Sequence, residues 1–415
     1  MIRPLFQPIV DLDSGDVVGV EALARGPAGP LHTPMALFEV ANQVDRLHEL
    51  DSLCRLTAIT TARDAAAHAP PLVFVNVEPG TVDLPMSAEL RAVLSRDLPF
   101  QIVVEFTERA LTRRLPALLR HADEIRARGN AVALDDIGVG PRSVAVLPLV
   151  QPEIVKLDMS LLAPGLPAHA TAAAAAVEAY AARTGAVVVA EGIETDEQRL
   201  AARRLGARWG QGWLFGRPGP MDELAAHRVR AIRPRLSVRT RSDAEGSSTP
   251  FDLAVSVGEV PLRVDGARVR ALSRELEGQA RALADLGVVM LALQDVRNLN
   301  GATATAYASI ALKAAAVGIL GRGVPAVPLP GAYGVDLAID DPLTREWVIA
   351  VLGPGDAVVL TAHEVGTAEL LPARAFDVVL SHDRDLVERT ARLLARRLTP
   401  RAAILRTTAV ADDPG

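Results

Sequence analysis

The chain has 415 residues, of which 49% are hydrophobic and 23% charged, a composition typical of a well-buried globular protein of two or three domains. Its formal net charge of −6 argues against a general nucleic-acid-binding protein, which would carry a basic surface. Cys54 is the one cysteine, which excludes an internal disulfide and a cysteine-based zinc site. We find no signal peptide and no apolar run long enough to span a membrane, so we expect a cytoplasmic protein.

The first half of the chain repeats a short apolar run followed by a segment of helical length. The eight runs are RPLFQPIV, DVVGVEAL, PLVFVNV, QIVVEFTE, AVALDD, EIVKLD, AVVVAEGIE and GQGWLFGRP. Runs this rich in Val, Ile and Leu are typical of strands buried on both faces. Segments 34–68, 108–128 and 168–183 lie between several of the runs and predict helices. The alternation indicates an α/β fold, and eight repeats within roughly 220 residues match a closed TIM (β/α)8 barrel.

The connection between the first two runs is too short to contain a helix. It consists of Asp13-Ser14-Gly15-Asp16, residues that favour a tight turn. We therefore expect a hairpin, in which the first strand is antiparallel to the second. The prediction is a modified TIM barrel over residues 1–228, with its first strand running against the others.

The composition changes after this region. Residues 229–250 are rich in Arg and Ser, which predicts an exposed linker. A basic segment could instead contact nucleic acid or a membrane surface, but no aromatic residues interleave with the arginines, so we favour the linker. Residues 251–400 predict a second, smaller α/β domain, and residues 401–415 a frayed tail. The strand candidates of this domain are GVVMLALQ, AVGILG, EWVIAVLG, AVVLTAHE and FDVVLSHD, between the helix candidates DGARVRALSRELEGQARALADL and LVERTARLLARRL.

Polar side chains follow the barrel runs where each strand is expected to end. Because the ends of parallel barrel strands face one pocket, we expect these side chains to lie close together. They are Glu21, Asn76, Glu105, Asp135, Asp136, Lys156, Asp158, Glu191, Glu194 and Gln211.

Each of these residues has a structural alternative when it is taken singly. Acidic residues after a strand often cap the next helix, and of these residues Glu194 fits such a capping role best. Lys156 could form a structural ion pair with Asp158. Seven strand ends that agree favour a shared site instead, because such an acidic cluster would repel itself without a cation. Carboxylate and amide oxygens without His or Cys favour Mg²⁺ or Mn²⁺, and the adjacent Asp135 and Asp136 suit a two-metal site.

These motifs resemble those of the EAL-domain phosphodiesterases of the bacterial second messenger cyclic di-GMP. The signature Glu21-Ala22-Leu23 stands in VGVEALAR, and FQPIV, FVNV, VEFTE, LDDIGVG, IVKLD, AEGIET and QGWLFGRP follow the family's order over residues 1 to about 225. The resemblance implies a hydrolase that converts cyclic di-GMP to linear pGpG and depends on Mg²⁺ or Mn²⁺. It also implies a homodimer.

The resemblance implies a role for each matching residue. Glu21, Asn76, Glu105 and Asp135 would hold one metal, and Asp135 and Asp136 the second. Lys156 would orient the attacking water. Glu191 would be a further metal ligand and would act on metal-bound water or as a base, and Glu194 would brace the loop that carries the paired aspartates. The substrate-binding residues would be Gln7, Leu23, Arg25, Asp158 and Gln211, with Arg25 contacting phosphate.

The sequence departs from the family in the loop after the paired aspartates. The family's usual form is DDFGTGYSSL, and this chain has DDIGVGPRSVAVL. Ile137, Val139, Pro141 and Arg142 replace Phe, Thr, Tyr and Ser. Because this loop couples metal binding to dimerisation in the family, the changes bear on rate and regulation, although no predicted metal ligand is lost.

The second domain resembles the DICT sensory domain. LSRELE, LALQDVRNLN and REWVIAVLGPGDAVVLTAHE carry the resemblance, which implies a regulatory input with an unknown signal. Gln294 and Tyr307 could line a pocket, although a core tyrosine fits equally well. Two functions follow for the whole chain: an active phosphodiesterase controlled by its C-terminal domain, or a weak or inactive cyclic di-GMP receptor that signals through that domain. A phosphodiesterase for another substrate, such as a glycerophosphodiester, would need histidines at the strand ends, where the sequence has none.

Overall fold

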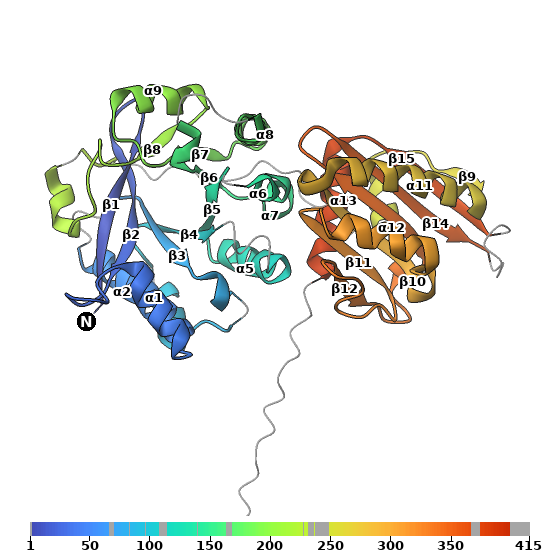
Figure 1. Ribbon diagram of the computed structural model, residues 1–415, viewed down its shortest axis with the longest axis horizontal. Coiled ribbons are helices and arrows are strands. Elements are labelled where there is room, and N and C mark those ends of the chain that lie inside the picture. Colours follow the sequence, from blue (N-terminus) through green and yellow to red (C-terminus); the bar gives the residue numbers. More distant parts are fainter. Residues whose placement is uncertain are drawn as a thin grey trace, which may run out of the picture.

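The protein folds into a closed barrel followed by a separate α/β domain (Figure 1). The computed structural model describes residues 2–65, 70–82, 84–95, 97–107, 114–138, 140–162, 168–226, 228–230, 236, 249–366 and 374–398. The barrel strands are β1 (Arg3–Asp11), β2 (Val17–Arg25), β3 (Leu72–Val77), β4 (Gln101–Thr107), β5 (Ala131–Ile137), β6 (Ile154–Leu157), β7 (Val187–Ala190) and β8 (Trp209–Gln211).

The first strand closes the barrel in the predicted antiparallel sense. β1 pairs antiparallel with both β2 and β8, whereas the six other neighbouring pairs are parallel. The short reversal between β1 and β2, over residues 12–16, uses Gly15 at φ 73°, a left-handed conformation that glycine adopts readily. The modified TIM barrel predicted from the sequence is therefore confirmed.

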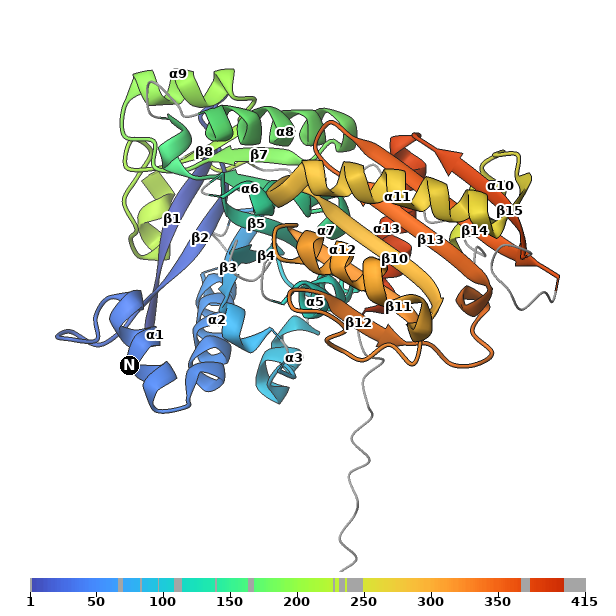
Figure 2. The same ribbon diagram turned by 45° about the vertical axis from the view of Figure 1, so that its right-hand side comes forward.

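Helices surround the barrel strands and cover their outer faces (Figure 2). The predicted helical segment 34–68 is two helices, because the chain turns at Asp45, which has φ 55°. The helices and 3-10 turns are α1 (Pro34–Gln43), α2 (Leu47–Asp64), η1 (Pro79–Thr81), α3 (Ala88–Leu94), α5 (Leu115–Ala127), α6 (Pro141–Ala145), α7 (Leu147–Val150), η2 (Met159–Leu162), α8 (Ala168–Thr184), α9 (Asp196–Arg204) and η3 (Met221–Ala226).

The inside of the barrel is a solid apolar core below the strand ends. Phe74 and Trp209 are fully buried there with smaller side chains from the other strands, and Leu236 packs against this core from the segment after the barrel. Most of the predicted linker, and the whole predicted tail of residues 401–415, lie outside the described residues. No described helix combines the length and hydropathy needed to span a bilayer.

The second domain is a seven-stranded sheet with helices on both faces. The strand order is β12-β11-β10-β13-β14-β15-β9, with β10, β11 and β12 parallel and the other pairs antiparallel. Helices α11 and α12 cover one face, and α10 and α13 the other. The elements are α10 (Pro250–Ser256), β9 (Leu262–Asp265), α11 (Gly266–Leu283), η4 (Ala284–Leu286), β10 (Val288–Asp295), η5 (Val296–Asn298), α12 (Gly301–Ala311), β11 (Ala316–Arg322), β12 (Tyr333–Asp336), η6 (Pro342–Arg345), β13 (Glu346–Leu352), β14 (Ala357–Val365), β15 (Ala375–Ser381) and α13 (Arg384–Arg397).

The two domains share one hydrophobic core through α13. This helix contacts β10, β13 and β14 of its own sheet and also α5 and α7 of the barrel, and the buried apolar cluster runs through it into both domains. Figures 1 and 2 both show the second domain beside the barrel on the side of α5 to α8. The C-terminal domain therefore docks against the helices that flank β5.

Candidate active site at the carboxyl ends of the barrel strands

The seven parallel barrel strands bring polar side chains together at one end of the barrel. Because the barrel is closed and twisted, residues toward the carboxyl ends of these strands lie around a common centre. The side chains are Glu21 from β2, Asn76 from β3, Glu105 from β4, Asp135 and Asp136 from β5, Lys156 from β6, Glu191 directly after β7, and Gln211 from β8.

Lys156 lies at the centre of this group. Its ammonium Nζ is 2.6 Å from Glu191 Oε1, 2.9 Å from Glu105 Oε1, 3.2 Å from Glu21 Oε2 and 3.2 Å from Asp135 Oδ1. The side chain of Lys156 is fully buried. Its charge is therefore compensated inside the barrel by carboxylates from four different strand ends. The alternative of a structural ion pair with Asp158 is not supported, since Asp158 is not among these partners.

Three amides complete the arrangement around Glu21. Asn76 Nδ2 donates a hydrogen bond of 2.9 Å to Glu21 Oε1, and Gln211 Nε2 donates one of 2.7 Å to Glu21 Oε2. Gln211 Nε2 also lies 3.1 Å from Gln7 Oε1, and Gln7 Nε2 donates to the carbonyl oxygen of Gly216. Because the Asn76 amide nitrogen is engaged, its carbonyl oxygen is left to face a cation.

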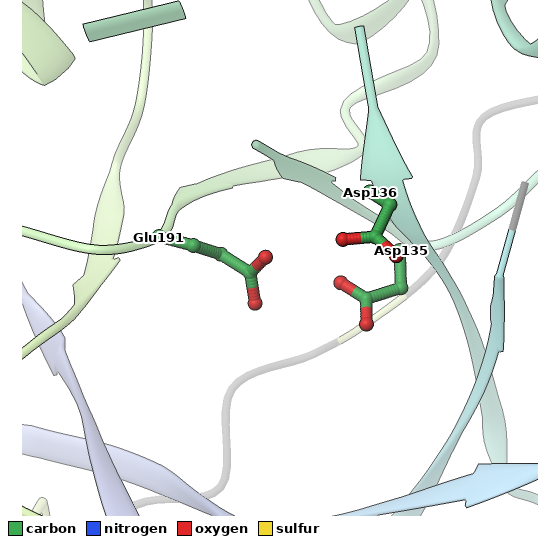
Figure 3. Close-up of side chains that lie close together, drawn as sticks. All are labelled: Asp135, Asp136 and Glu191. Carbon is green, nitrogen blue, oxygen red and sulfur yellow. The ribbon is translucent and has the colours of Figure 1, made fainter. Parts of the chain in front are cut away.

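The paired aspartates face the same space because the chain leaves strand geometry between them. Successive residues of a regular strand point to opposite faces, which would separate Asp135 from Asp136. Asp136 has φ 59°, and the pairing of β5 with β6 shifts register between Leu134 and Ile137. Figure 3 shows the result: the carboxylates of Asp135, Asp136 and Glu191 point toward one another. One ligating oxygen from each lies within 4.8 Å of the others.

Burial and charge shift the pKa values of this cluster in a consistent way. Burial lowers the pKa of Lys156, but the carboxylates of Asp135, Glu105, Glu191 and Glu21 together hold it well above its usual value. Burial raises the pKa of Glu21, but the Lys156 ammonium and the amide hydrogen bonds overcome this and leave it lowered. The Lys156–Glu21 pair is therefore ionised, and Lys156 cannot serve as a general base.

The remaining carboxyl groups are held closer to their neutral forms. Burial, followed by the charge of Glu21, raises the pKa of Glu105 well above its usual range. Burial raises the pKa of Glu191 to about 8, with Lys156 opposing and Asp135 adding to the shift, and burial with the Asp135 charge raises that of Asp136. One ammonium does not neutralise five carboxyl groups, so the cluster requires protons or additional cations.

The donor set fits divalent cations. Glu105 Oε2 and Gln211 Oε1 are buried and accept no hydrogen bond, which is costly for polar atoms unless an ion is bound. The oxygens come from carboxylates and amides without sulfur or imidazole, a set typical of Mg²⁺ or Mn²⁺. Asp135, Asp136 and Glu191 form a group whose spacing could hold one ion.

A cavity of about 300 Å³ opens beside this cluster. Asn76 lines it, together with Leu23 and Ala24 from the end of β2. Its floor includes the buried ion pair between Arg55 and Asp51, which lie 2.5 Å apart. The cavity is mostly apolar, and Asn76 connects it to the cluster through its hydrogen bond to Glu21, so a ligand with a ring system and a charged group could extend from one to the other.

Three residues predicted for the site lie outside the central cluster. Arg25, at the end of β2, donates from Nη1 to the carbonyl oxygen of Ala24. Asp158 accepts from Ser160 N at 2.8 Å, and its charge contributes to the raised pKa of Asp136. Glu194 is exposed, and within the described residues its carboxylate has no hydrogen bond or ion pair, whereas its main-chain N–H bonds Gln198 at the start of α9. Their predicted roles stay predictions.

The sequence interpretation missed the support beneath Asn76. Asp51 on α2 accepts hydrogen bonds from Glu78 N and Thr81 Oγ1, which fixes the turn that follows β3. Arg55 completes the buried pair one helical turn later. The signal available in the sequence was an Asp and an Arg at i, i+4 on a helix whose surrounding residues are apolar.

Comparison with known families identifies this barrel. Residues 1–218 match the EAL domain. The chain belongs to the EAL domain family. Residues 251–365 match the DICT domain, described as a sensory domain in diguanylate cyclases and two-component systems. Both resemblances inferred from the sequence motifs are thereby confirmed.

Several curated proteins resemble the EAL region of this chain. It is 32% identical over 237 residues to the bifunctional diguanylate cyclase/cyclic di-GMP phosphodiesterase MucR of Pseudomonas aeruginosa, covering 53% of this chain and 33% of that protein. It is 31% identical over 227 residues to the cyclic di-GMP phosphodiesterase RocR of the same organism, covering 52% of this chain and 57% of RocR. The solved structure of the PaMucR phosphodiesterase in complex with c-di-GMP has a TM-score of 0.48 and 25% identity, covering 54% of this chain and 94% of that one. The EAL region thus matches less than two thirds of the length of either curated relative.

Proposed function

We propose that this EAL protein hydrolyses cyclic di-GMP to linear pGpG with two divalent cations, Mg²⁺ or Mn²⁺, and that its DICT domain regulates the reaction. The observation that carries the proposal is the convergence of four carboxyl groups on the single ammonium of Lys156, with the Asp136 carboxylate beside two of them. The names of the curated relatives support cyclic di-GMP as the substrate. The protein would act in the cytoplasm, where this messenger is made.

The residues present fit the proposed cations. Glu21, Asn76, Glu105 and Asp135 would hold one ion, and Asp135 and Asp136 the other, with Glu191 close to both aspartates. When bound, such ions lower the pKa of water and offset the charge that develops on phosphate. Ion binding would also deprotonate Glu105, Asp136 and Glu191, whose neutral forms are favoured by burial without it.

The side chains would then have separate catalytic and substrate-binding roles. Lys156 keeps its proton, so it would donate hydrogen bonds that orient the attacking water and stabilise negative charge. Glu191, deprotonated, would accept a proton from that water. Leu23 and Asn76 line the 300 Å³ cavity, which would receive one guanosine moiety of the dinucleotide. Gln7 and Gln211 would approach the substrate from the opposite side, and Arg25 would contact a phosphate.

Turnover of cyclic di-GMP by the full chain tests this proposal. The assay supplies Mg²⁺ or Mn²⁺ and follows pGpG by chromatography. Glu21→Gln removes a metal ligand with little change of volume and is expected to reduce the rate at least ~100-fold. Glu275→Gln is the matched control, because Glu275 is exposed on α11 of the other domain.

A cyclic di-GMP receptor without turnover is the alternative function. The substituted loop favours it, since Ile137 and Arg142 stand where the family has Phe and Ser. Binding of cyclic di-GMP by the wild-type protein with no pGpG in either metal would establish the receptor and reject the enzyme. The assembled carboxylate cluster, with Ile137 fully buried behind it, favours the enzyme.

A further inference from the structure

The C-terminal domain touches the barrel at the helix that follows the paired aspartates. Asp136 is followed by Ile137 and Gly138, and α6 begins at residue 141. Helix α6 packs against η4 of the second domain. Arg142, near the start of α6, places Nη2 3.1 Å and Nε 3.2 Å from Asp285 Oδ1. A charge pair between the domains thus lies six residues along the chain from Asp136.

The described residues on either side of position 139 make close contacts. The carbonyl oxygen of Ile137 accepts a hydrogen bond of 3.2 Å from Asp158 N. A Cβ atom added at Gly138 would lie only 2.4 Å from the Leu161 side chain. Ser143 Oγ donates to the carbonyl oxygen of Gly140 at 2.9 Å, which ties α6 to the end of the loop. A shift of α6 would therefore be transmitted to the strained left-handed residue Asp136.

Further contacts between the domains lie next to α6, on α7 and α8. Helix α13 presents Glu388, Arg392 and Arg396 at i, i+4 spacing toward the barrel. Glu388 Oε1 accepts from Arg183 Nη2 at 2.7 Å, and Arg392 Nη1 donates to the carbonyl oxygen of Pro148 on α7. A cavity of about 30 Å³, room for one water molecule, lies where α6, α7 and α8 meet the C-terminal domain, whereas a cavity of about 360 Å³ lies beside Asp123 and Arg396. The interface is therefore more closely packed beside α6 than beside α5, so movement in the C-terminal domain would reach α6.

We infer that Arg142 is a positioning residue, which holds the Asp135–Asp136 loop in its metal-binding conformation through its contact with Asp285 of the C-terminal domain. The inference rests on the proposed function for its consequence, control of the hydrolytic rate. Its direct prediction concerns metal binding, which can be measured whether or not the protein turns over substrate.

The test is calorimetric titration of the full chain with Mn²⁺ alone. Arg142→Glu and Asp285→Arg each place like charges opposite one another. Each is expected to weaken Mn²⁺ binding roughly threefold to tenfold, the range for a half-exposed charge pair coupled to a site. The double swap Arg142→Glu/Asp285→Arg restores the pair in reverse and is expected to bind within about twofold of the wild type.

Asp123→Arg is the matched control. Asp123 on α5 pairs with Arg396 of α13 at 3.3 Å, and the exposed fractions of the two side chains, 48% and 46%, resemble those of Asp285 and Arg142, 50% and 41%. This pair also joins the two domains, but α5 precedes β5 and does not carry the paired aspartates. Asp123→Arg is expected to leave Mn²⁺ binding unchanged.

Three results would overturn the inference. Unchanged Mn²⁺ binding in both single variants would show that α6 does not act on the loop. If Asp123→Arg weakens Mn²⁺ binding to the same extent, the effect comes from general loosening of the interface. If the double swap binds Mn²⁺ as weakly as the single variants, the contact with Asp285 is not responsible. If Arg142→Glu fails to fold, Asp285→Asn gives a milder test. This variant is expected to bind Mn²⁺ more weakly than the wild type, and wild-type Mn²⁺ binding would contradict the inference. Wild-type Mn²⁺ binding without hydrolysis would reject the proposed function alone.

Discussion

Lys156 Nζ lies 2.6 Å from Glu191 Oε1, although β6 and the end of β7 deliver the two residues from separate strands. Lys156 is fully buried, and it also contacts carboxylates from β2, β4 and β5. One lysine thus links the strand ends electrostatically before any cation binds. Its replacement is therefore informative about both stability and metal binding.

We expect Lys156→Met to destabilise the protein without metal by about 3–5 kcal/mol, because it leaves buried carboxylates without their ammonium. Saturating Mn²⁺ should recover much of this loss, since cations can then replace the missing charge. Chemical unfolding with and without Mn²⁺ measures both values. If Mn²⁺ stabilises neither the variant nor the wild type, the carboxylates are not a metal site.

Asp136→Asn should remove one of two bound metal ions, because Asp136 would serve one ion whereas Asp135 would serve both. The metal content at saturating Mn²⁺ is expected to fall from two ions to one, and Asp135→Asn should reduce it further. Calorimetric stoichiometry or elemental analysis measures this order. Equal loss in the two variants would contradict the assignment of Asp135 as the shared ligand.

Glu346 in the second domain should make stability depend on pH. It is buried at the start of β13, where burial raises its pKa to about 7 even though Thr249 and the Phe251 N–H donate hydrogen bonds to it. An unfolded glutamate has a pKa near 4.5, so the folded protein binds more protons between these values, and stability must fall as pH rises through this window.

Glu346→Gln removes this dependence. Relative to the wild type, the variant is expected to gain about 2–3 kcal/mol of unfolding free energy between pH 5 and pH 8. The barrel carboxylates titrate in both proteins, so their contribution cancels when the unfolding free energies of the two proteins are subtracted. Parallel stability curves for the two proteins over that range would show that Glu346 ionises normally.

Leu394→Ala should destabilise both domains together, because α13 belongs to the core they share. Leu394 is fully buried, and its truncation is expected to cost about 2–5 kcal/mol. Variants that keep a single tryptophan report the domains separately, since Trp209 and the exposed Trp213 lie in the barrel domain and Trp347 lies on β13. Both signals should shift to the same extent on chemical unfolding, and a shift of Trp347 alone would show that the barrel folds independently of α13.

The barrel could be predicted from the sequence because each strand is buried on both faces and therefore reads as a continuous apolar run. The antiparallel first strand followed from a turn too short for a helix. By contrast, β9 and β12 gave no signal, since these short edge strands leave most of their residues partly or wholly exposed. The break at Asp45 was missed because a left-handed aspartate leaves no mark in the hydrophobic pattern.

The site could be predicted in its residue types but not in its geometry. The polar residues at the strand ends were visible one by one, and the fold brings them together. The left-handed conformation that turns Asp136 toward Asp135 depends on the register shift between β5 and β6. The pairing of Arg142 with Asp285 joins residues 143 positions apart, so no local pattern could indicate it.

The central claim is that the barrel strand ends gather carboxylates around divalent cations. Anomalous diffraction from crystals of the full chain grown with Mn²⁺ and cyclic di-GMP tests it most directly. We predict two manganese peaks, both within bonding distance of Asp135, with Glu21, Asn76, Glu105 and Asp136 as the other protein ligands. Clear density for cyclic di-GMP with no manganese at these residues would contradict the account.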